Sequence, residues 1–201
     1  HTLFVGDTGS LAVNPLIHSA LPYDPARDLA PISLLFRATF LILVASKSRY
    51  ATVADMLADA RREPGKMSYA SLGNGHPTQM CVETLARAAN VNLLHVPFKE
   101  AGALFTSVAL GDVDFTVFGL NSASGYLKGG KLKALAVAAP VRLTEAPEIP
   151  TIVEAGGPAV EMRPWAALVG VAGTAPVVLT TIQREVVDAL GAPAVRGRIE
   201  A

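Results

Sequence analysis

The segment SLGNGHPT at 71–78 combines residue types that suit the binding of an anion. Its two glycines allow positive φ and a close approach of the backbone to a ligand. Pro77 suits the first position of a helix, which makes His76 the cap residue and directs the N–H groups of Thr78 and Gln79 back into the loop. A helix N-terminus favours negative charge. The pattern therefore predicts an anion-binding loop, although a glycine-rich turn that binds nothing has the same composition.

Two other segments have a similar arrangement. VGDTGS at 5–10 is an apolar run followed by the hydroxyls of Thr8 and Ser10, and HVPFKEAG at 95–102 places Lys99 just before a helical stretch. Ligands of open α/β sheets bind beyond the carboxyl ends of the strands. Because the three loops offer amides and hydroxyls but no evident acid–base pair, they indicate binding of a small anion rather than its chemical conversion.

The sequence gives little support for catalysis, nucleotide binding or metal binding. The chain contains no GxxxxGK[ST], GxSxG, HExxH or GxGxxG motif, and its four histidines lack metal-ligand spacing. A single cysteine, Cys81, excludes an internal disulfide and a cysteine-rich zinc site. We interpret Asp112 and Asp114 as turn residues before a strand, and KGGKLK at 128–133 as the end of a helix. We expect no catalytic residue, no metal and no cofactor.

Composition narrows the class of protein. The 201 residues are 51% hydrophobic, with 17 basic and 17 acidic side chains. This balance argues against nucleic acid as a partner. Apolar runs such as FLILVA at 40–45 are too short to cross a bilayer and indicate buried strands.

Short apolar runs alternate with helical patterns, which predicts an α/β fold. The expected strands are 2–5, 40–45, 67–70, 92–96, 113–118, 133–138 and 164–171. The expected helices are 51–63, 77–89, 101–110, 121–128 and 176–190. Two long extended stretches, 28–48 and 156–173, are typical of crossings between two lobes.

Capping residues support the first and last helices. Thr52 is the expected N-cap of the first, with Asp55 three residues on, and Val53, Met56, Leu57 and Ala60 share one apolar face. Thr174 is the expected cap of the last, with Pro176 in its first turn. The face of Leu179, Ile182, Val186 and Leu190 predicts packing against a core.

A series of motifs along the chain is similar to a known family. In order they are LPYDPARDLAPIS, PGKMSYASLGNG, HVPFK, GDVD, GKLKALAV, PTIVEAG and AGTAP. The chain resembles, over nearly its whole length, the Bug family of TctC-like periplasmic solute receptors of tripartite tricarboxylate transporters. The resemblance implies a two-lobed type II periplasmic-binding-protein (Venus flytrap) fold, a small organic acid as ligand, membrane transporter subunits as partners, a periplasmic location and no enzymatic activity.

The resemblance also implies domain boundaries and binding residues. Residues 41–161 would form domain 2, and residues 1–40 with 162–201 would form what remains of domain 1. Because the chain opens directly on the apolar pattern HTLFVG, we expect domain 1 to be truncated at its N-terminus. The implied ligand-binding residues are Thr8, Gly9, Ser10, Ser71, Gly73, Asn74, Gly75, His76, Thr78, Lys99, Gly102 and Phe118.

Departures from the family pattern leave the ligand open. Leu11 stands where histidine is common, Phe98 where tyrosine is common, and Glu100 where glycine is common. Phe118 replaces a frequent aspartate, and His76-Pro77 replaces a serine pair. These changes suit a more apolar acid. Two alternatives stay open at this point: the effector domain of a LysR-type transcriptional regulator, and an enzyme on a related two-lobed scaffold.

Overall fold

The computed structural model describes residues 2–195, which form two compact units. Unit 1 comprises the chain up to Ala38 and from Pro164 onward, and unit 2 comprises Thr39–Arg163. The boundaries expected after residues 40 and 161 each fall two residues from these. Each unit has its own sheet, and the two are described separately below.

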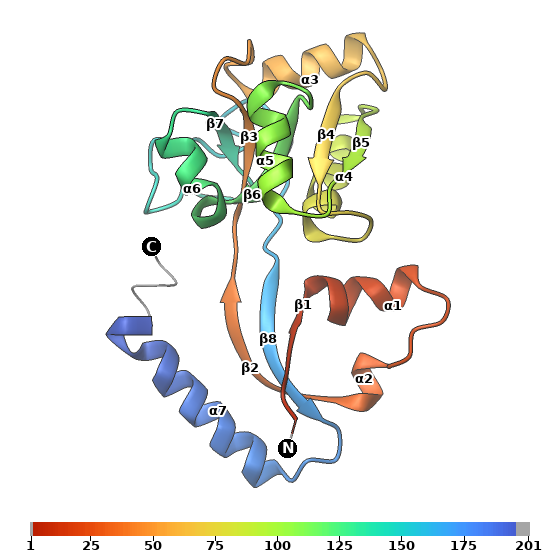
Figure 1. Ribbon diagram of the computed structural model, residues 1–201, viewed down its shortest axis with the longest axis vertical. Coiled ribbons are helices and arrows are strands. Elements are labelled where there is room, and N and C mark those ends of the chain that lie inside the picture. The colour runs from red at the N-terminus through yellow and green to blue at the C-terminus, as the bar shows by residue number, and fades with distance from the viewer. Residues whose placement is uncertain (1, 196–201) are drawn as a thin grey trace. The chain divides into compact units, whose positions relative to one another are not determined.

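Unit 2 contains a five-stranded mixed sheet (Figure 1). Its strands are β3 (Phe40–Ala45), β4 (Ser68–Ser71), β5 (Leu94–Pro97), β6 (Phe115–Gly119) and β7 (Leu132–Val137), in the order β5-β4-β6-β3-β7. Strand β4 runs parallel to β5 and β6, while β3 runs antiparallel to β6 and β7. All five strands were predicted, to within two residues at either end.

Helices cover both faces of this sheet. Those of unit 2 are α3 (Val53–Arg62), α4 (Pro77–Ala89), α5 (Ala101–Leu110) and α6 (Leu120–Lys128). Side chains of α3 and α4 belong to one buried cluster, and those of α5 and α6 belong to another. Alternate residues of β3 enter the two clusters: Ile42 lies in the first, and Leu41 and Leu43 lie in the second. A strand buried on both faces explains the unbroken apolar run FLILVA.

Local capping signals in unit 2 are confirmed. Thr52 accepts the N–H of Asp55 at 3.1 Å, and the Asp55 carboxylate accepts the N–H of Thr52 at 3.0 Å. This capping box starts α3, whose buried residues are Val53, Met56, Leu57 and Ala60 as predicted. Lys128 ends α6, and Gly130 follows with φ of 62°. The KGGKLK segment is therefore a helix end.

Unit 1 contains a three-stranded antiparallel sheet in the order β1-β8-β2. The strands are β1 (Phe4–Asp7), β2 (Leu29–Arg37) and β8 (Trp165–Val171). The prediction for residues 28–48 is corrected here, because the sequence indicated only an extended crossing where the structure has strand β2. Pro31 cannot donate to a neighbouring strand, but β2 lies at an edge of the sheet, where a proline is tolerated. Two register shifts along its pairing with β8 accommodate the irregularity.

Short helical segments follow β1 and precede β2. They are a π-helical turn, η1 (Gly9–Val13), then α1 (Asn14–Ile17) and α2 (Pro25–Asp28). Asp24 caps α2 by accepting the N–H groups of Ala26 and Arg27. The last helix, α7 (Pro176–Gly191), begins at the predicted proline.

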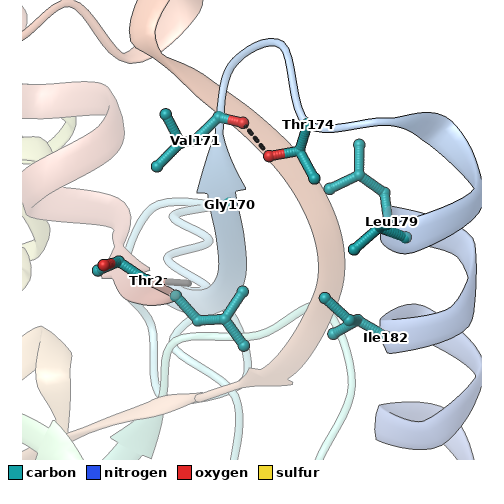
Figure 2. Close-up of a pocket in the computed structure, with 8 residues that line it drawn as sticks. Thr2, Gly170, Val171, Thr174, Leu179 and Ile182 are labelled. Carbon is teal, nitrogen blue, oxygen red and sulfur yellow. Dashed lines mark hydrogen bonds between the residues drawn. The ribbon is translucent and has the colours of Figure 1, made fainter.

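Two predictions about α7 are wrong. Ala175, rather than Thr174, is its cap residue, and the Thr174 hydroxyl instead donates to the Val171 carbonyl at 2.7 Å (Figure 2). Leu179, Ile182, Val186 and Leu190 form only a half-buried stripe, and α7 has no fully buried residue. The apolar period was correct, but among the described residues too few elements pack on this helix to bury it. No helix in residues 2–195 is both long and apolar enough to cross a membrane.

Candidate ligand-binding site

The carboxyl ends of β4, β5 and β6 lie at one edge of the unit 2 sheet, because the three strands run parallel. Short loops lead from β4 into α4 and from β5 into α5, and β6 leads directly into α6 (Figure 1). The first two loops are tied together where the N–H of Phe98 donates to the carbonyl of Ser71 at 2.8 Å. Three helix N-termini thus face the same edge of the sheet, which is where open α/β sheets bind ligands.

The loop after β4 has the backbone that its glycines predicted. Gly73 has φ of 106° and Gly75 has φ of 75°, values that side-chain-bearing residues rarely adopt. A Cβ built on Gly73 would meet nothing within 4 Å, so this glycine is required by its backbone angle and leaves open space beside it. Asn74, between the two, is exposed.

His76 is the cap of α4 and Pro77 is its first residue, as predicted. The N–H donors expected to be available to a ligand are used within the loop, however. Thr78 donates to His76 Nδ1 at 3.2 Å, and Gln79 donates to the carbonyl of His76 at 2.9 Å. Thr78 is fully buried, and its hydroxyl accepts the N–H of Leu72 at 3.1 Å. This is a correction: the cap that starts the helix consumes its own donors.

The N-termini of α5 and α6 differ from that of α4. Their cap residues are Glu100 and Gly119, and within the described residues neither helix has a side-chain cap. Lys99 and Gly102 are exposed beside the start of α5. A Cβ on Gly102 would also meet nothing within 4 Å, so the first turn of α5 is open to close approach. The helix-start amides and Lys99 can attract an anion here, while the exposed carboxylate of Glu100 opposes them.

Phe118 is half buried and packs in an aromatic group near the end of β6. Its ring centroid lies 4.8 Å from that of Phe105 and 6.4 Å from that of Phe40. Much of this side chain is therefore engaged in the core that supports α5.

A polar network beneath the β4 loop contains residues that sequence reasoning missed. Tyr69 and His95 are partners across β4 and β5, and their rings stack with centroids 4.9 Å apart. The Tyr69 hydroxyl donates to the carboxylate of Glu83 on α4. His95 Nε2 lies 2.6 Å from Ser71 Oγ, and His95 Nδ1 lies 3.5 Å from Gln79 Nε2. Only the register of two strands distant in sequence brings these groups together.

Burial sets the ionisation of this part of unit 2. Desolvation is the main cause that raises the pKa of Tyr69, and its hydrogen bond to Glu83 adds to the effect. Desolvation also lowers the pKa of His95, against a smaller opposing effect of the Glu83 charge. Burial raises the pKa of the Cys81 thiol to about 12, which leaves it protonated and unreactive at neutral pH.

In unit 1, the Thr8–Ser10 turn follows β1. The Thr8 hydroxyl accepts the N–H of Trp165 at 2.9 Å, which joins the turn to β8. The Ser10 hydroxyl donates to Asp7 Oδ1 at 2.6 Å, and the same carboxylate oxygen accepts the N–H of Ser10 at 2.7 Å. Gly9 opens η1. Both hydroxyls expected to face a ligand thus also have structural partners.

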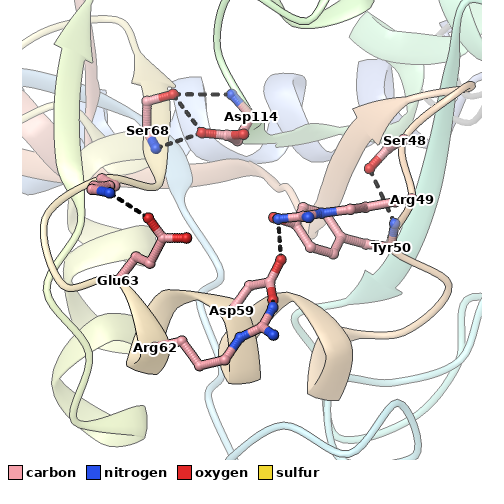
Figure 3. Close-up of polar contacts among 9 residues, drawn as sticks. Ser48, Arg49, Tyr50, Asp59, Arg62, Glu63, Ser68 and Asp114 are labelled. Atoms are coloured by element: carbon pink, nitrogen blue, oxygen red, sulfur yellow. Dashed lines mark hydrogen bonds and ion pairs between the residues drawn. The ribbon is translucent and has the colours of Figure 1, made fainter.

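Two other features of the molecule do not suit an anion. At the opposite end of β4 and β6, Asp114 accepts the N–H and hydroxyl of Ser68 at 2.7 and 2.8 Å (Figure 3). Nearby, Asp59 pairs with both Arg49 and Arg62. Asp114 therefore acts structurally, through a partner on β4 that is 46 positions away and not through the local turn that the sequence predicted.

The other feature is a hollow in unit 1 of about 340 Å³, drawn in Figure 2. It is lined mainly by aliphatic side chains: Thr2, Leu3, Gly170, Val171, Thr174, Val178, Leu179 and Ile182. None of these described lining residues carries a charge. An apolar hollow of this kind offers an organic acid no counter-charge.

Solved structures define the class of protein. R. palustris Rpa4515 with adipate superposes with a TM-score of 0.89 at 27% identity, over 98% of this chain and 66% of that one. MatC from Rhodopseudomonas palustris with bound malate superposes with a TM-score of 0.86 at 26% identity. The match covers 98% of this chain and 67% of that one. Periplasmic binding protein BugD gives 0.86 at 22% identity. The chain has the α/β fold of periplasmic binding proteins.

The family follows from a family model that matches residues 1–200. The chain belongs to the tripartite tricarboxylate transporter family receptors. A protein from the tcbD–tcbE intergenic region of Pseudomonas sp. strain P51 is 32% identical over 96% of this chain and 57% of its own length. Protein BugT of Bordetella pertussis is 24% identical over 97% of this chain and 60% of its own length. The chain therefore spans less than two thirds of these curated relatives.

Proposed function

We propose that the protein containing this chain is a periplasmic receptor that binds a small organic acid and presents it to the membrane subunits of a tripartite tricarboxylate transporter. The observation that carries the proposal is the carboxyl edge of β4, β5 and β6, where three helix N-termini meet and two have no side-chain cap. Uncapped amides at a helix start are donors suited to a carboxylate. Family membership and the adipate and malate structures of relatives support the same class of ligand.

We assign the ligand contacts of unit 2 mainly to the starts of α5 and α6. Lys99 supplies charge, and the backbone at Gly102 allows close approach. Ser71, Thr78 and His76 shape the neighbouring loop, whose exposed tip is Asn74. The roles of Thr8, Gly9, Ser10 and Phe118 rest on the family resemblance alone.

The chemistry of the edge supports binding without turnover. Besides amides, hydroxyls and Lys99, the edge carries Glu100 and the imidazole of His76, which accepts the N–H of Thr78 as the cap of α4. The Cys81 thiol is protonated within the core. Nucleophilic catalysis requires a nucleophile within hydrogen-bond reach of a base. Ser71 and His95 meet that distance, but Ser71 is fully buried and its hydroxyl is engaged with Gly73.

Calorimetry on the full-length protein tests this function. Malate and adipate are titrated beside their neutral diamides, and Lys99→Gln is compared with Lys128→Gln, an exposed lysine at the far end of α6. We expect an acid to bind, its diamide to bind much more weakly, and only Lys99→Gln to reduce affinity. Equal binding of acid and diamide would contradict the carboxylate assignment, and steady product formation would contradict the receptor function.

A further inference from the structure

His95 occupies a position that the proposed function does not use. It lies on the edge strand β5, is half buried, and stacks on Tyr69 of the first buried cluster. Its ring instead bridges Ser71, at the end of β4, and Gln79, in the first turns of α4. These two residues flank the loop that carries Gly73 and Gly75.

Hydrogen-bond donors and acceptors in this network determine which ring nitrogen carries the proton. Gln79 Oε1 accepts the N–H of Gly75 at 2.7 Å, so its amide nitrogen faces His95 Nδ1 at 3.5 Å and Asn74 Oδ1 at 3.3 Å. An amide nitrogen can only donate, so His95 Nδ1 must be the acceptor. The proton of the neutral ring is then on Nε2, which donates to Ser71 Oγ at 2.6 Å.

The side chains that contact His95 also hold the backbone of both glycines in the loop. Ser71 Oγ accepts the N–H of Gly73 at 3.0 Å and donates to the Gly73 carbonyl at 3.4 Å, while Gln79 holds the N–H of Gly75. Both glycines have positive φ, which glycine adopts without strain but shares with many other conformations, so these hydrogen bonds select one conformation of the loop. The neutral ring of His95 therefore supports the two hydrogen-bonding side chains that hold the loop.

We propose that His95 is a positioning residue for the 72–76 loop, and that protonation of its ring in mild acid releases the loop and weakens ligand binding. The inference rests on the proposed function for its effect on affinity. A second proton on Nδ1 would face the Gln79 amide nitrogen, placing two donors against each other. Rotation of the Gln79 amide would remove that conflict but would turn its nitrogen toward the N–H of Gly75, so one of the loop's hydrogen bonds is lost in either case.

Two titratable groups, Tyr69 and Glu83, face the ring of His95. Tyr69 of β4 stacks on the His95 ring, and the negative charge of Glu83 on α4 favours its protonated form. Burial lowers the pKa of His95 and the Glu83 charge opposes that effect, with burial the larger cause. The ring is thus neutral at neutral pH, and its protonation requires a lower pH than that of an ordinary histidine.

Two substitutions separate the roles of the ring in the full-length protein. His95→Phe keeps an aromatic ring against Tyr69 but removes both hydrogen bonds. His95→Gln keeps a nitrogen donor near the Nε2 position but cannot be protonated. With malate and adipate as probes, we expect His95→Phe to bind about tenfold more weakly at neutral pH, and His95→Gln to retain affinity within about threefold.

The pH profile then tests the switch. As the pH falls from neutral through the ordinary histidine range and below it, affinity should fall more in the wild type than in His95→Gln. Ionisation of the acid is common to both proteins and cancels. His18→Gln, which replaces an exposed ring in unit 1, should behave as the wild type. Parallel profiles of the wild type and His95→Gln would overturn the proposal.

A ligand-independent readout distinguishes failure of this inference from failure of the proposed function. With ¹⁵N-labelled glycine and histidine, the amide signals of Gly73 and Gly75 should titrate with the midpoint of the His95 ring, and the neutral ring should carry its proton on Nε2. If no acid binds but these signals titrate together, the positioning role stands and the receptor function is wrong. If they do not move with His95, the positioning role is wrong.

Discussion

Replacement of Gly73 by alanine is a direct test of how the candidate loop is held. Gly73 has φ of 106°, and a new Cβ would meet no atom within 4 Å. Any effect of the methyl group on the free protein must therefore come from backbone strain and not from a clash. A residue held in such a region costs about 1–3 kcal/mol.

That strain can appear in either of two measurements. If the loop keeps its conformation, Gly73→Ala lowers the free energy of unfolding by about 1–3 kcal/mol. If the loop relaxes instead, the ligand must restore the bound conformation, and the same energy appears as an affinity loss of about 5–150-fold. Denaturant unfolding and calorimetry on the full-length protein, taken together, should account for the whole cost.

Two other glycines provide controls. Gly125 lies within α6 and Gly102 lies at the start of α5, and a Cβ on either would also meet nothing within 4 Å. Gly125→Ala should be neutral or stabilising by about 0.5–1 kcal/mol, as expected for a helix, and should not affect binding. Gly102→Ala should weaken binding without loss of stability. If Gly73→Ala unfolds and binds as Gly125→Ala does, the strain argument is wrong.

Other predictions concern stability and association. Asp55→Asn should lower stability at neutral pH, because the hydrogen bonds in the capping box hold the pKa of Asp55 below its usual value. The difference in stability between the wild type and Asp55→Asn should close as the pH falls below about 3.8 and through the lowered pKa, because a carboxyl group with a depressed pKa stabilises the fold only while it is ionised. Denaturant unfolding at several pH values measures this difference. A difference that stays constant with pH would contradict the prediction. The 201-residue chain should self-associate through exposed apolar side chains of α7, such as Val177 at 72% exposure. Light scattering should show less association for Val177→Asp with Val187→Asp, and a monomeric wild-type chain would contradict this prediction.

Strand and helix positions were largely predictable because their signals are local. The capping box at Thr52, the proline at the start of α4 and the glycines with positive φ all follow from side-chain chemistry within a few residues. The failures have equally specific causes. Strand β2 was missed because Pro31 argues against a strand unless its edge position is known. The Thr174 cap failed because a nearby carbonyl, that of Val171, took its hydroxyl.

The candidate site shows the same division. By itself the sequence determined that glycine-rich and proline-rich loops follow three apolar strands and lead into helices, since backbone freedom and capping depend on neighbouring residues. Only the tertiary structure decided which donors the loops retain. The His95 ring meets Ser71 across 24 positions of chain, and Trp165 meets Thr8 across 157, because strand pairing sets those partners. Register is a property of the assembled sheet, so hydrogen bonds that depend on it cannot be inferred from any local stretch.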